Sequence, residues 1–315
     1  MLKSAVIIIL CFMITTCALF NISSAGSVGI IHYNVGRQSS KNNIPSENAG
    51  RQIRYGKALI VRTAYYLGPH GKIAAISNGM NCQNCHNAAG TKPFGLNLYA
   101  VAANYPQFMA RTGNVISTAG RINGCFQRSL NGKKLDTASK EMRAMVAYIN
   151  WLGRDVAKGQ KPVGSGVAKL AYPDHAADTL KGRAVFIQKC MACHGNNGQG
   201  LLAADRVVYI YPPLWGKHSY NDGAGLYRVT SFAGFVKNNM PYGSTYKNPQ
   251  LTDEEAWNVA AFVNSQPRPH FDQHDDWKDT KKKPIDFPFG PYADGFNEQQ
   301  HKYGPFGPIV QAQKN

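Results

Sequence analysis

Hydrophobic positions recur at helical spacing in four separate stretches of this chain. Apolar side chains return every three or four positions at residues 51–67, 139–152, 179–189 and 252–263. Ser139 and Thr252 stand where they can cap the helices that follow, and Glu255 completes a capping box with Thr252. The pattern predicts a mainly α protein, with one more short helix at residues 96–109 among loops.

The helical pattern occurs twice in the same order. An opening helix leads into a Cys-x-x-Cys-His motif in each half of the chain, and the two motifs lie 108 residues apart. The two closing helices lie about as far apart, so the chain duplicates one unit. We expect a first domain at residues 26–156 and a second at 173–266, joined by a Gly/Pro/Lys-rich linker at 157–172.

The two ends of the chain have different compositions. Residues 1–25 combine Lys3, an apolar run and small residues before a cleavage point, which is typical of a secretory signal peptide and predicts export to the periplasm. An uncleaved membrane anchor is the alternative, and the residues before Cys17 make a poor lipoprotein signal. We expect residues 26–50 to form a polar arm. Residues 267–315 are Pro/Gly-rich with too many aromatics for a disordered tail, which predicts an irregular arm that wraps over the domains.

The charge of the chain narrows its partners. The net charge is +17, and without residues 1–25 the chain carries 34 Lys and Arg against 18 Asp and Glu. Nucleic acid, an anionic membrane surface and small anions or acidic partners all fit a basic protein. Export disfavours nucleic acid, and the basic residues are dispersed, so small anions fit best. Membrane attachment is expected only through an uncleaved signal.

The Cys-x-x-Cys-His motifs carry the most specific chemistry. They are the attachment signature of c-type haem, in which both thiols bond the haem and the histidine is the proximal iron ligand. A thioredoxin-like redox pair would need a strand–helix context, and a zinc site would need two more ligands. The motifs predict two covalently bound haem c groups, attached at Cys82, Cys85, Cys190 and Cys193, with His86 and His194 as iron ligands.

The second domain offers one methionine as its distal iron ligand. Met240 precedes Pro241, and no other methionine lies between His194 and the closing helix. A buried structural methionine is the alternative. The segment "YPPLWG" upstream offers a proline carbonyl that can bind the N–H of the proximal imidazole.

The first domain has no Met-Pro, and its distal loop position is occupied by "GCFQRS". Cys125 in this segment follows His86 by 39 residues, close to the 46 that separate His194 from Met240. A thiolate is a good ligand for ferric iron and lowers its potential, so Cys125 is the candidate distal ligand. A buried inert thiol or an intermolecular disulfide is the alternative.

Basic residues surround Cys125 in the sequence. Arg111 and Arg121 precede it, and Arg128 and Ser129 follow it. Scattered arginines usually mark a solvated basic face. Beside a haem pocket they favour an anion clamp, because guanidinium groups match the geometry of oxyanions.

The sequence resembles the dihaem thiosulfate dehydrogenases. The matching segments are "NCQNCH", "ARTGNVISTAGRINGCFQRSLNGK", "CMACHG", "PPLWGKHSYNDGAG", "NNMPYG" and "DFPFGPYADGF" with "QHKYGPF". The resemblance implies two cytochrome c domains in tandem and oxidation of two thiosulfates to tetrathionate, which some members also reverse. It places the catalytic haem ligand on Cys125 and substrate binding on Arg111, Arg121 and Ser129.

One position departs from some members of that family. A lysine directly before the distal methionine ligates the oxidised second haem in those members. Asn239 stands there in this chain, and the nearest lysine is Lys237. We therefore expect constant ligation of the second haem by His194 and Met240.

The residues and the resemblance together suggest a mechanism. The Cys125 sulfur leaves the iron and bonds the terminal sulfur of one thiosulfate, and a second thiosulfate releases tetrathionate. Electrons pass from the His86 haem to the His194 haem and on to a cytochrome or other periplasmic partner. Two rivals are a non-catalytic dihaem electron carrier of the cytochrome c4 kind and a Sox-type cytochrome that loads sulfur onto a carrier protein.

Overall fold

A computed structural model of the chain describes residues 44–204 and 206–314. The expected signal peptide at residues 1–25 and most of the expected polar arm at 26–50 lie outside these residues. Within the described residues, no helix combines the length and the apolar character that a bilayer crossing requires. Short helices dominate the described chain, which confirms the predicted mainly α class.

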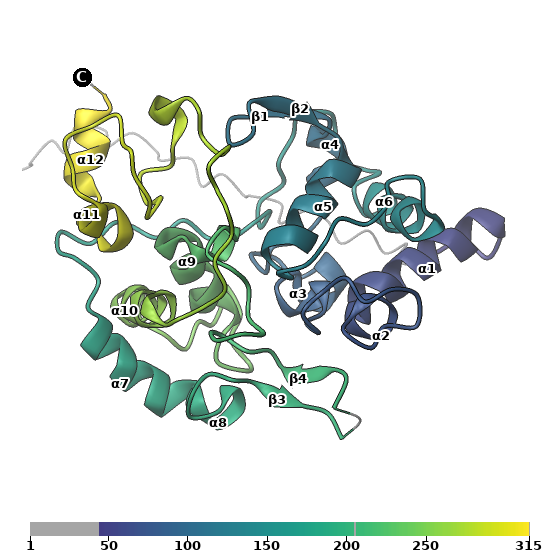
Figure 1. Ribbon diagram of the computed structural model, residues 1–315, viewed down its shortest axis with the longest axis horizontal. Helices are drawn as coiled ribbons and strands as arrows, with labels where there is room; N and C mark the ends of the chain where they lie inside the picture. Colours follow the sequence, from purple (N-terminus) through teal and green to yellow (C-terminus); the bar gives the residue numbers. More distant parts are fainter. Residues whose placement is uncertain (1–43, 205, 315) are drawn as a thin grey trace, which may run out of the picture. The chain divides into compact units, whose positions relative to one another are not determined.

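The first half of the described chain, from purple to teal in Figure 1, is built from helices around one small hairpin. Its helices are α1 (Asn48–Val61), α2 (Thr63–Leu67), η1 (Cys82–Asn84), α3 (Asn87–Gly90), α4 (Val101–Asn104), α5 (Thr118–Arg128) and α6 (Lys140–Leu152). Strands β1 (Gln107–Met109) and β2 (Asn114–Ile116) pair antiparallel.

The second half repeats this design, from teal to green in Figure 1. Its helices are α7 (Thr179–Lys189), α8 (Met191–His194), η2 (Gly225–Tyr227), α9 (Val229–Asn239) and α10 (Asp253–Ser265). Its antiparallel hairpin consists of β3 (Leu201–Leu202) and β4 (Tyr209–Tyr211).

The repeat is visible in how the opening and closing helices cross. A Cβ at Gly56 of α1 would meet the backbone of Ala144 and the side chain of Tyr148 on α6. A Cβ at Gly182 of α7 would meet the equivalent pair on α10, which is Asn258 and Phe262. Each glycine therefore lets two helix backbones approach closely, and the two crossings share one geometry.

The predicted helix caps are confirmed. The Ser139 hydroxyl accepts a hydrogen bond from the backbone N–H of Met142, and Thr252 accepts one from the N–H of Glu255 in a complete capping box. The helix expected at residues 51–67 is interrupted at Arg62, where α1 ends and α2 begins at the next residue.

The short helix expected among loops at residues 96–109 is present as α4, which is confined to Val101–Asn104, and β1 follows it within that range. Helix α4 ends at Asn104 because Tyr105 precedes Pro106, and a residue before proline is driven out of the helical region.

The linker and the C-terminal arm both fold onto the rest of the described chain. The linker pairs with the loop after α3, where Phe94 and Leu96 donate backbone hydrogen bonds to Gly164 and Gly166. The arm is irregular, as expected, but also contains η3 (Thr280–Lys282), α11 (Glu298–Tyr303) and α12 (Gly307–Ala312). Phe306 of the arm has no exposed surface, so the arm adds to the hydrophobic core.

Candidate active site

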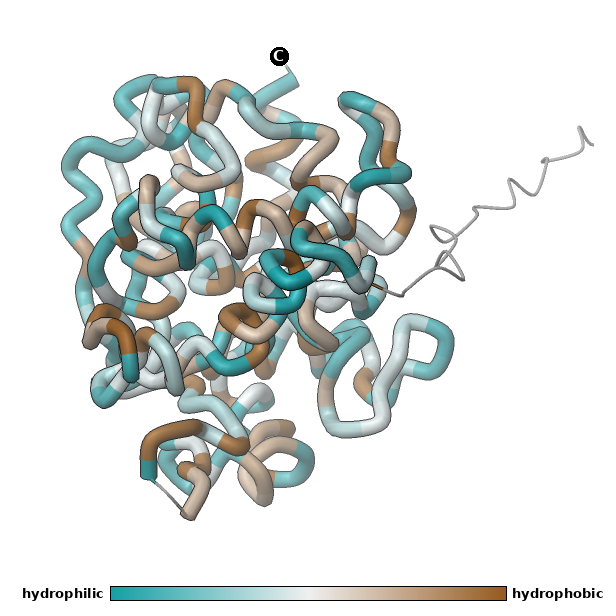
Figure 2. Tube along the Cα trace, turned by 90° about the vertical axis from the view of Figure 1, so that its right-hand side faces the viewer, coloured by the Kyte–Doolittle hydropathy of each residue, from teal (hydrophilic) through white to brown (hydrophobic). Residues whose placement is uncertain are grey.

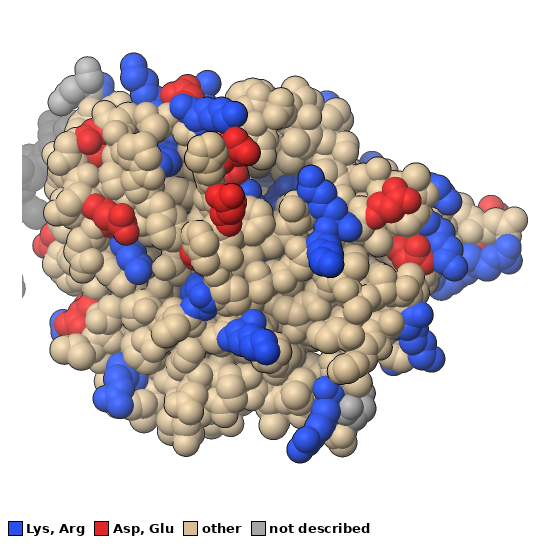
Figure 3. Space-filling view, in the orientation of Figure 1, with Lys and Arg blue, Asp and Glu red and all other residues tan. Residues whose placement is uncertain are grey.

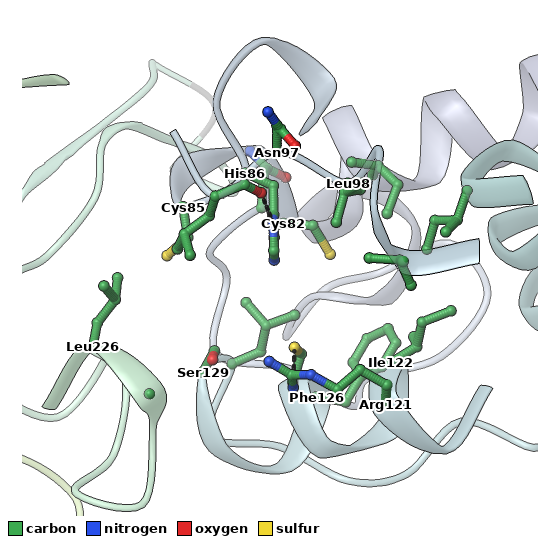
Figure 4. A pocket seen from close by; sticks show the side chains of 18 of the residues that line it. Cys82, Cys85, His86, Asn97, Leu98, Arg121, Ile122, Phe126, Ser129 and Leu226 are labelled. Atoms are coloured by element: carbon green, nitrogen blue, oxygen red, sulfur yellow. Dashed lines mark hydrogen bonds between the residues drawn. The ribbon is translucent and has the colours of Figure 1, made fainter. Parts of the chain in front are cut away.

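A cavity of about 350 Å³ opens between the first Cys-x-x-Cys-His motif and helix α5. Its wall is mainly apolar and includes Met80, Leu98, Ile122, Phe126 and Ile149. Cys82, Cys85 and His86 lie on one side of it, and Arg121, Phe126 and Ser129 lie on the other (Figure 4). Cys125, on the same segment as these three residues, also lines the cavity. The structure thus brings the motif of the first half and Cys125 to one site.

Backbone contacts fix the direction of the His86 ring. His86 Nδ1 lies 2.6 Å from the carbonyl oxygen of Leu96, and Leu96 is itself held by Gly166 of the linker. With its proton donated to that carbonyl, Nδ1 leaves the Nε2 lone pair free, and the ring points into the cavity in Figure 4. Such an imidazole is prepared to bind iron.

Cys125 lies on helix α5, which corrects the expectation that its segment forms a distal loop. Ser117 caps the helix at its start, because its side chain accepts a hydrogen bond from the N–H of Gly120. Ile122 and Phe126 are buried one turn apart, so packing holds the segment helical. The helical form puts the cysteine on a rigid element.

The helix also explains how Cys125 meets its neighbours. Arg121 precedes it by four residues and Ser129 follows it by four, so all three share one face of α5. The Arg121 guanidinium donates a hydrogen bond to the Cys125 sulfur at 3.1 Å, drawn as a dashed line in Figure 4. Arg121 and Ser129 both line the cavity.

The thiols around this cavity differ in acidity. Burial raises the pKa of both Cys82 and Cys85 to about 12. Burial also raises the pKa of Cys125, but the positive charge of Arg121 and the nearby His86 ring outweigh this effect, and the pKa falls to about 6. At neutral pH Cys125 is therefore a thiolate, the form that binds metals and attacks sulfur.

Arg111 lies beside this site but does not line the cavity. Its guanidinium donates to the carbonyl oxygen of Gly223 at 3.1 Å and lies 4.0 Å from Asp276 of the C-terminal arm. Burial, together with the neighbouring positive charge of Arg128 and against the negative charge of Asp276, lowers the pKa of Arg111 to about 10. Of the two predicted arginines, only Arg121 touches the sulfur.

The sequence interpretation missed four residues around the site. Tyr105 lines the cavity and hydrogen-bonds Arg121. Arg228 and Ser231 line it from the second half of the chain, and Asp276 binds Arg128 at 2.8 Å. No spacing rule could have found them, because each reaches the site through long-range folding.

The second motif shows a matching proximal arrangement. His194 Nδ1 lies 2.8 Å from the carbonyl oxygen of Pro212, which confirms the expected proline carbonyl of "YPPLWG". Burial lowers the pKa of His194, which favours the neutral ring, against the opposite effect of the hydrogen bond with Pro212. Met240 ends α9 directly before Pro241 and packs against the hydrophobic core.

Two polar side chains close to Met240 in the sequence, Lys237 and Asn239, bind other partners. Lys237 donates to the carbonyl oxygen of Leu251 at 2.7 Å and pairs with Asp253 at 2.6 Å. The Asn239 amide donates to Phe94 in the loop after α3 and to Phe235. Asn239 thus ties the loop beside the first motif to the segment that carries Met240.

The residues of both motifs fit haem c. Each has two cysteines at the attachment spacing and a histidine whose Nδ1 is held by a backbone carbonyl, and the first has a sulfur across the cavity. Residues 72–157 match the model of the SoxA/TsdA cytochrome c domain, and residues 179–267 match that of cytochrome c. The chain is a c-type cytochrome with two such domains.

Relatives that match both cytochrome regions of the chain define the family more narrowly. The chain is 36% identical to the thiosulfate dehydrogenase of Stutzerimonas stutzeri, over 73% of this chain and 71% of that protein. It is 40% identical to the enzyme of that name from Allochromatium vinosum, over 73% and 83%. The chain belongs to the thiosulfate dehydrogenase family.

A solved structure agrees with this assignment. Thiosulfate dehydrogenase (TsdBA) from Marichromatium purpuratum, in its as-isolated form, aligns with a TM-score of 0.66 and 33% identity. The alignment covers 73% of this chain and 49% of that one, so this chain spans about half the length of the solved chain.

Proposed function

We propose that this protein oxidises two thiosulfate ions to one tetrathionate and passes on the two electrons released. The observation that carries the proposal is the position of the Cys125 sulfur, which lines the same cavity as His86 and accepts a hydrogen bond from Arg121 at 3.1 Å. A reactive sulfur beside a cation, at a haem-binding site, suits a sulfur-containing anion. The family relatives supply the substrate class.

Two haem c groups complete the proposed enzyme. Cys82 and Cys85 attach the first, and Cys190 and Cys193 attach the second. His86 and Cys125 are the proposed ligands of one iron, and His194 and Met240 are those of the other. When bound, the haems supply one-electron redox centres that take up electrons from the substrate.

The anion is held by charge and hydrogen bonding. The guanidinium of Arg121 neutralises the sulfonate end of thiosulfate, and the Ser129 hydroxyl donates from the next turn of α5. Arg111 contributes its charge from the edge of the site, where burial strengthens the effect of a cation. This arrangement brings the terminal sulfur of thiosulfate to Cys125.

The proposed chemistry takes place at the Cys125 sulfur. The thiolate and one thiosulfate form an S–S bond and release two electrons, which gives a cysteine S-thiosulfonate. A second thiosulfate then attacks the sulfur that is bonded to Cys125, the S–S bond to the protein breaks, and tetrathionate leaves. Cys125 returns as a thiolate, as in thiol–disulfide exchange.

The surroundings of the reaction are also part of the proposal. The periplasm is the proposed location, and a c-type cytochrome or similar redox protein is the proposed acceptor. The exchange steps are reversible in principle, so a reduced partner would let the same site reduce tetrathionate.

The two rival functions lack support at this site. A pure electron carrier has no use for an arginine bound to a thiolate haem ligand. The SoxA/TsdA domain model, taken alone, fits both a Sox-type cytochrome and a thiosulfate dehydrogenase. The matched thiosulfate dehydrogenases, however, extend over 73% of the chain and reach into its second cytochrome c domain. A self-contained dehydrogenase is favoured over a Sox-type cytochrome.

The test is direct. Purified protein carrying haem, mixed with thiosulfate and ferricyanide, should form one tetrathionate for every two ferricyanides reduced. Cys125→Gly should keep both haems attached and lose turnover. Sulfur loading of a carrier protein without tetrathionate, or full turnover by Cys125→Gly, would contradict the proposal.

A further inference from the structure

The β3–β4 hairpin exposes apolar side chains to an unusual degree. Leu201 and Leu202 of β3 are 49% and 38% exposed, and Ile210 of β4 is 56% exposed. Along β4, Tyr209 and Tyr211 face inward and Ile210 faces outward, as the alternation of a strand requires. Figure 2 shows the hairpin as a brown, hydrophobic stretch of the tube.

The hairpin is anchored to the second proximal histidine at both ends. The backbone N–H of Gly200, just before β3, donates to the carbonyl oxygen of His194 at 2.9 Å. Pro212, just after β4, accepts from His194 Nδ1 at 2.8 Å. The hairpin is therefore the surface element most directly connected to the second haem-binding histidine.

Two tyrosines bring the distal side of this site to the same surface. Tyr211 stands 6.2 Å from the His194 ring between centroids, and its hydroxyl hydrogen-bonds Cys193. Tyr242 is 94% exposed and lies near Tyr211. Because Tyr242 follows Met240 by two residues, the proximal and distal sides of the site meet at one apolar patch.

The charges that remain free in this half of the described chain are positive. Its described carboxylates are bound, for example Asp253 to Lys237, Glu255 to Lys189 and Asp222 to His270. Lys217, six residues after β4, and Lys247, five residues after Tyr242, are exposed and pair with no carboxylate among the described residues, and the Lys247 ammonium lies 5.9 Å from the centroid of the Tyr246 ring. In Figure 3 the lower part of the face, where α7, α8 and the hairpin lie in Figure 1, shows several Lys and Arg and few carboxylates.

We propose that the electron acceptor docks on the hairpin surface, which is formed by Leu201, Leu202, Ile210 and Tyr242 and flanked by Lys217 and Lys247. This acceptor is a small redox protein with an acidic rim around an apolar contact area. The proposal rests on the proposed function. Exposed apolar patches rimmed by charge are typical of protein contacts, and complementary charge speeds the encounter.

Two acceptors serve as probes. One is mitochondrial cytochrome c, which is basic. The other is the same cytochrome succinylated to a net negative charge, with its own haem–methionine bond intact. Each form is offered to the holoenzyme as the acceptor for thiosulfate oxidation. We expect the acidic form to be reduced with the higher kcat/KM, and the difference to shrink as salt screens the charges.

Surface variants then locate the contact. The double variant Leu202→Ser/Ile210→Ser should lower kcat/KM for the acidic acceptor about tenfold, as the loss of contact hot spots does. The matched control Leu180→Ser changes a leucine on α7 that is 79% exposed and lies outside the hairpin, and should change nothing. Lys217→Glu should act like the double variant, whereas the exposed Lys57→Glu on α1 should not.

Turnover with ferricyanide distinguishes a failure of the docking surface from a failure of the proposed function. All these variants should turn over normally with ferricyanide, which needs no docking surface. Absent turnover in the unmodified protein would refute the function itself. Normal ferricyanide turnover with equal rates for the acidic acceptor in all variants would refute the docking surface alone. A dimer, or binding to anionic lipid vesicles, that the hairpin variant abolishes would also overturn it, because the patch would then have another occupant.

Discussion

The two cytochrome domains of this chain share a frame and differ in their distal residues. Gly56 and Gly182 stand at equivalent helix crossings, and a backbone carbonyl holds Nδ1 of both proximal histidines. Opposite His86, however, a helix carries Cys125 with Arg121 bound to it, whereas the second half offers Met240 at the end of α9. On the proposed function, the first half carries out the substrate chemistry and the second half transfers electrons, and the distal side chain is the main difference between them.

Charge divides the two halves in the same way. Residues 26–156 contain 16 Lys and Arg against 4 Asp and Glu, whereas residues 173–266 contain 8 against 7. Of the net charge of +16 outside residues 1–25 (34 − 18), +12 (16 − 4) belongs to the half that has the proposed anion site. On the proposed function, that half attracts the dianionic substrate, and the other half selects the redox partner by local contacts.

Cys125→Met removes the difference between the domains and has the largest expected effect. Methionine has a thioether in place of the reacting thiolate, so the covalent step loses its nucleophile and turnover should fall by about 1,000-fold or more. Both haems should stay attached through the unchanged cysteines. The first should gain a higher potential, measured by redox titration, because methionine donates less electron density than thiolate. Retained turnover would break the comparison.

Arg121→Lys tests how far the anion site depends on the guanidinium. Lysine keeps the charge but loses the fork that binds the sulfur and an oxyanion together, so kcat/KM for thiosulfate should fall about 10- to 100-fold. Steady-state kinetics with ferricyanide measure the change. Arg51→Lys, an exposed site on α1, is the control. Equal losses in both variants would show that only diffuse charge matters.

Asp276→Asn tests the contact that the C-terminal arm makes with the basic cluster. Asp276 is nearly buried and bonds Arg128 at 2.8 Å, so its loss should lower the free energy of unfolding by about 1–3 kcal/mol. KM for thiosulfate should rise a few fold, because Arg111 loses a carboxylate that helps to position it.

The exposed pair of Asp279 with Lys282 is the matched control on the same arm. Asp279→Asn should change the free energy of unfolding by less than about 0.5 kcal/mol. Chemical denaturation measures both variants. If the two substitutions lower the free energy of unfolding equally, the arm does not stabilise the anion site.

Lys237→Gln should have the smallest effect. Lys237 is held by Leu251 and Asp253, so it is not available as an iron ligand in this conformation. The absorption and magnetic circular dichroism spectra of the oxidised second haem should therefore match those of the unmodified protein. A changed ligand field would mean that Lys237 reaches the iron after all.

Local features were predictable from the sequence. The Cys-x-x-Cys-His motifs, the caps at Ser139 and Thr252 and the proline carbonyl beside His194 each depend on residues close in the chain. Spacing rules work at this range because helix geometry and proline backbone geometry are set locally.

Features that depend on long-range packing were not predictable. The segment around Cys125 was expected to be a loop by analogy with Met240, but burial of Ile122 and Phe126 makes it a helix. The contact of Asp276 with Arg128 joins residues 148 positions apart, and no periodicity in the sequence encodes it. The same holds for Tyr105 at Arg121.

The central claim is that the Cys125 sulfur itself bonds the substrate. Oxidised holoenzyme can be mixed with thiosulfate, quenched in acid without reductant, digested and analysed by mass spectrometry. The account predicts a peptide containing Cys125 that has gained one thiosulfate, and removal of this adduct when excess thiosulfate is added before the quench. Full tetrathionate production with Cys125 unmodified at every time point would contradict it.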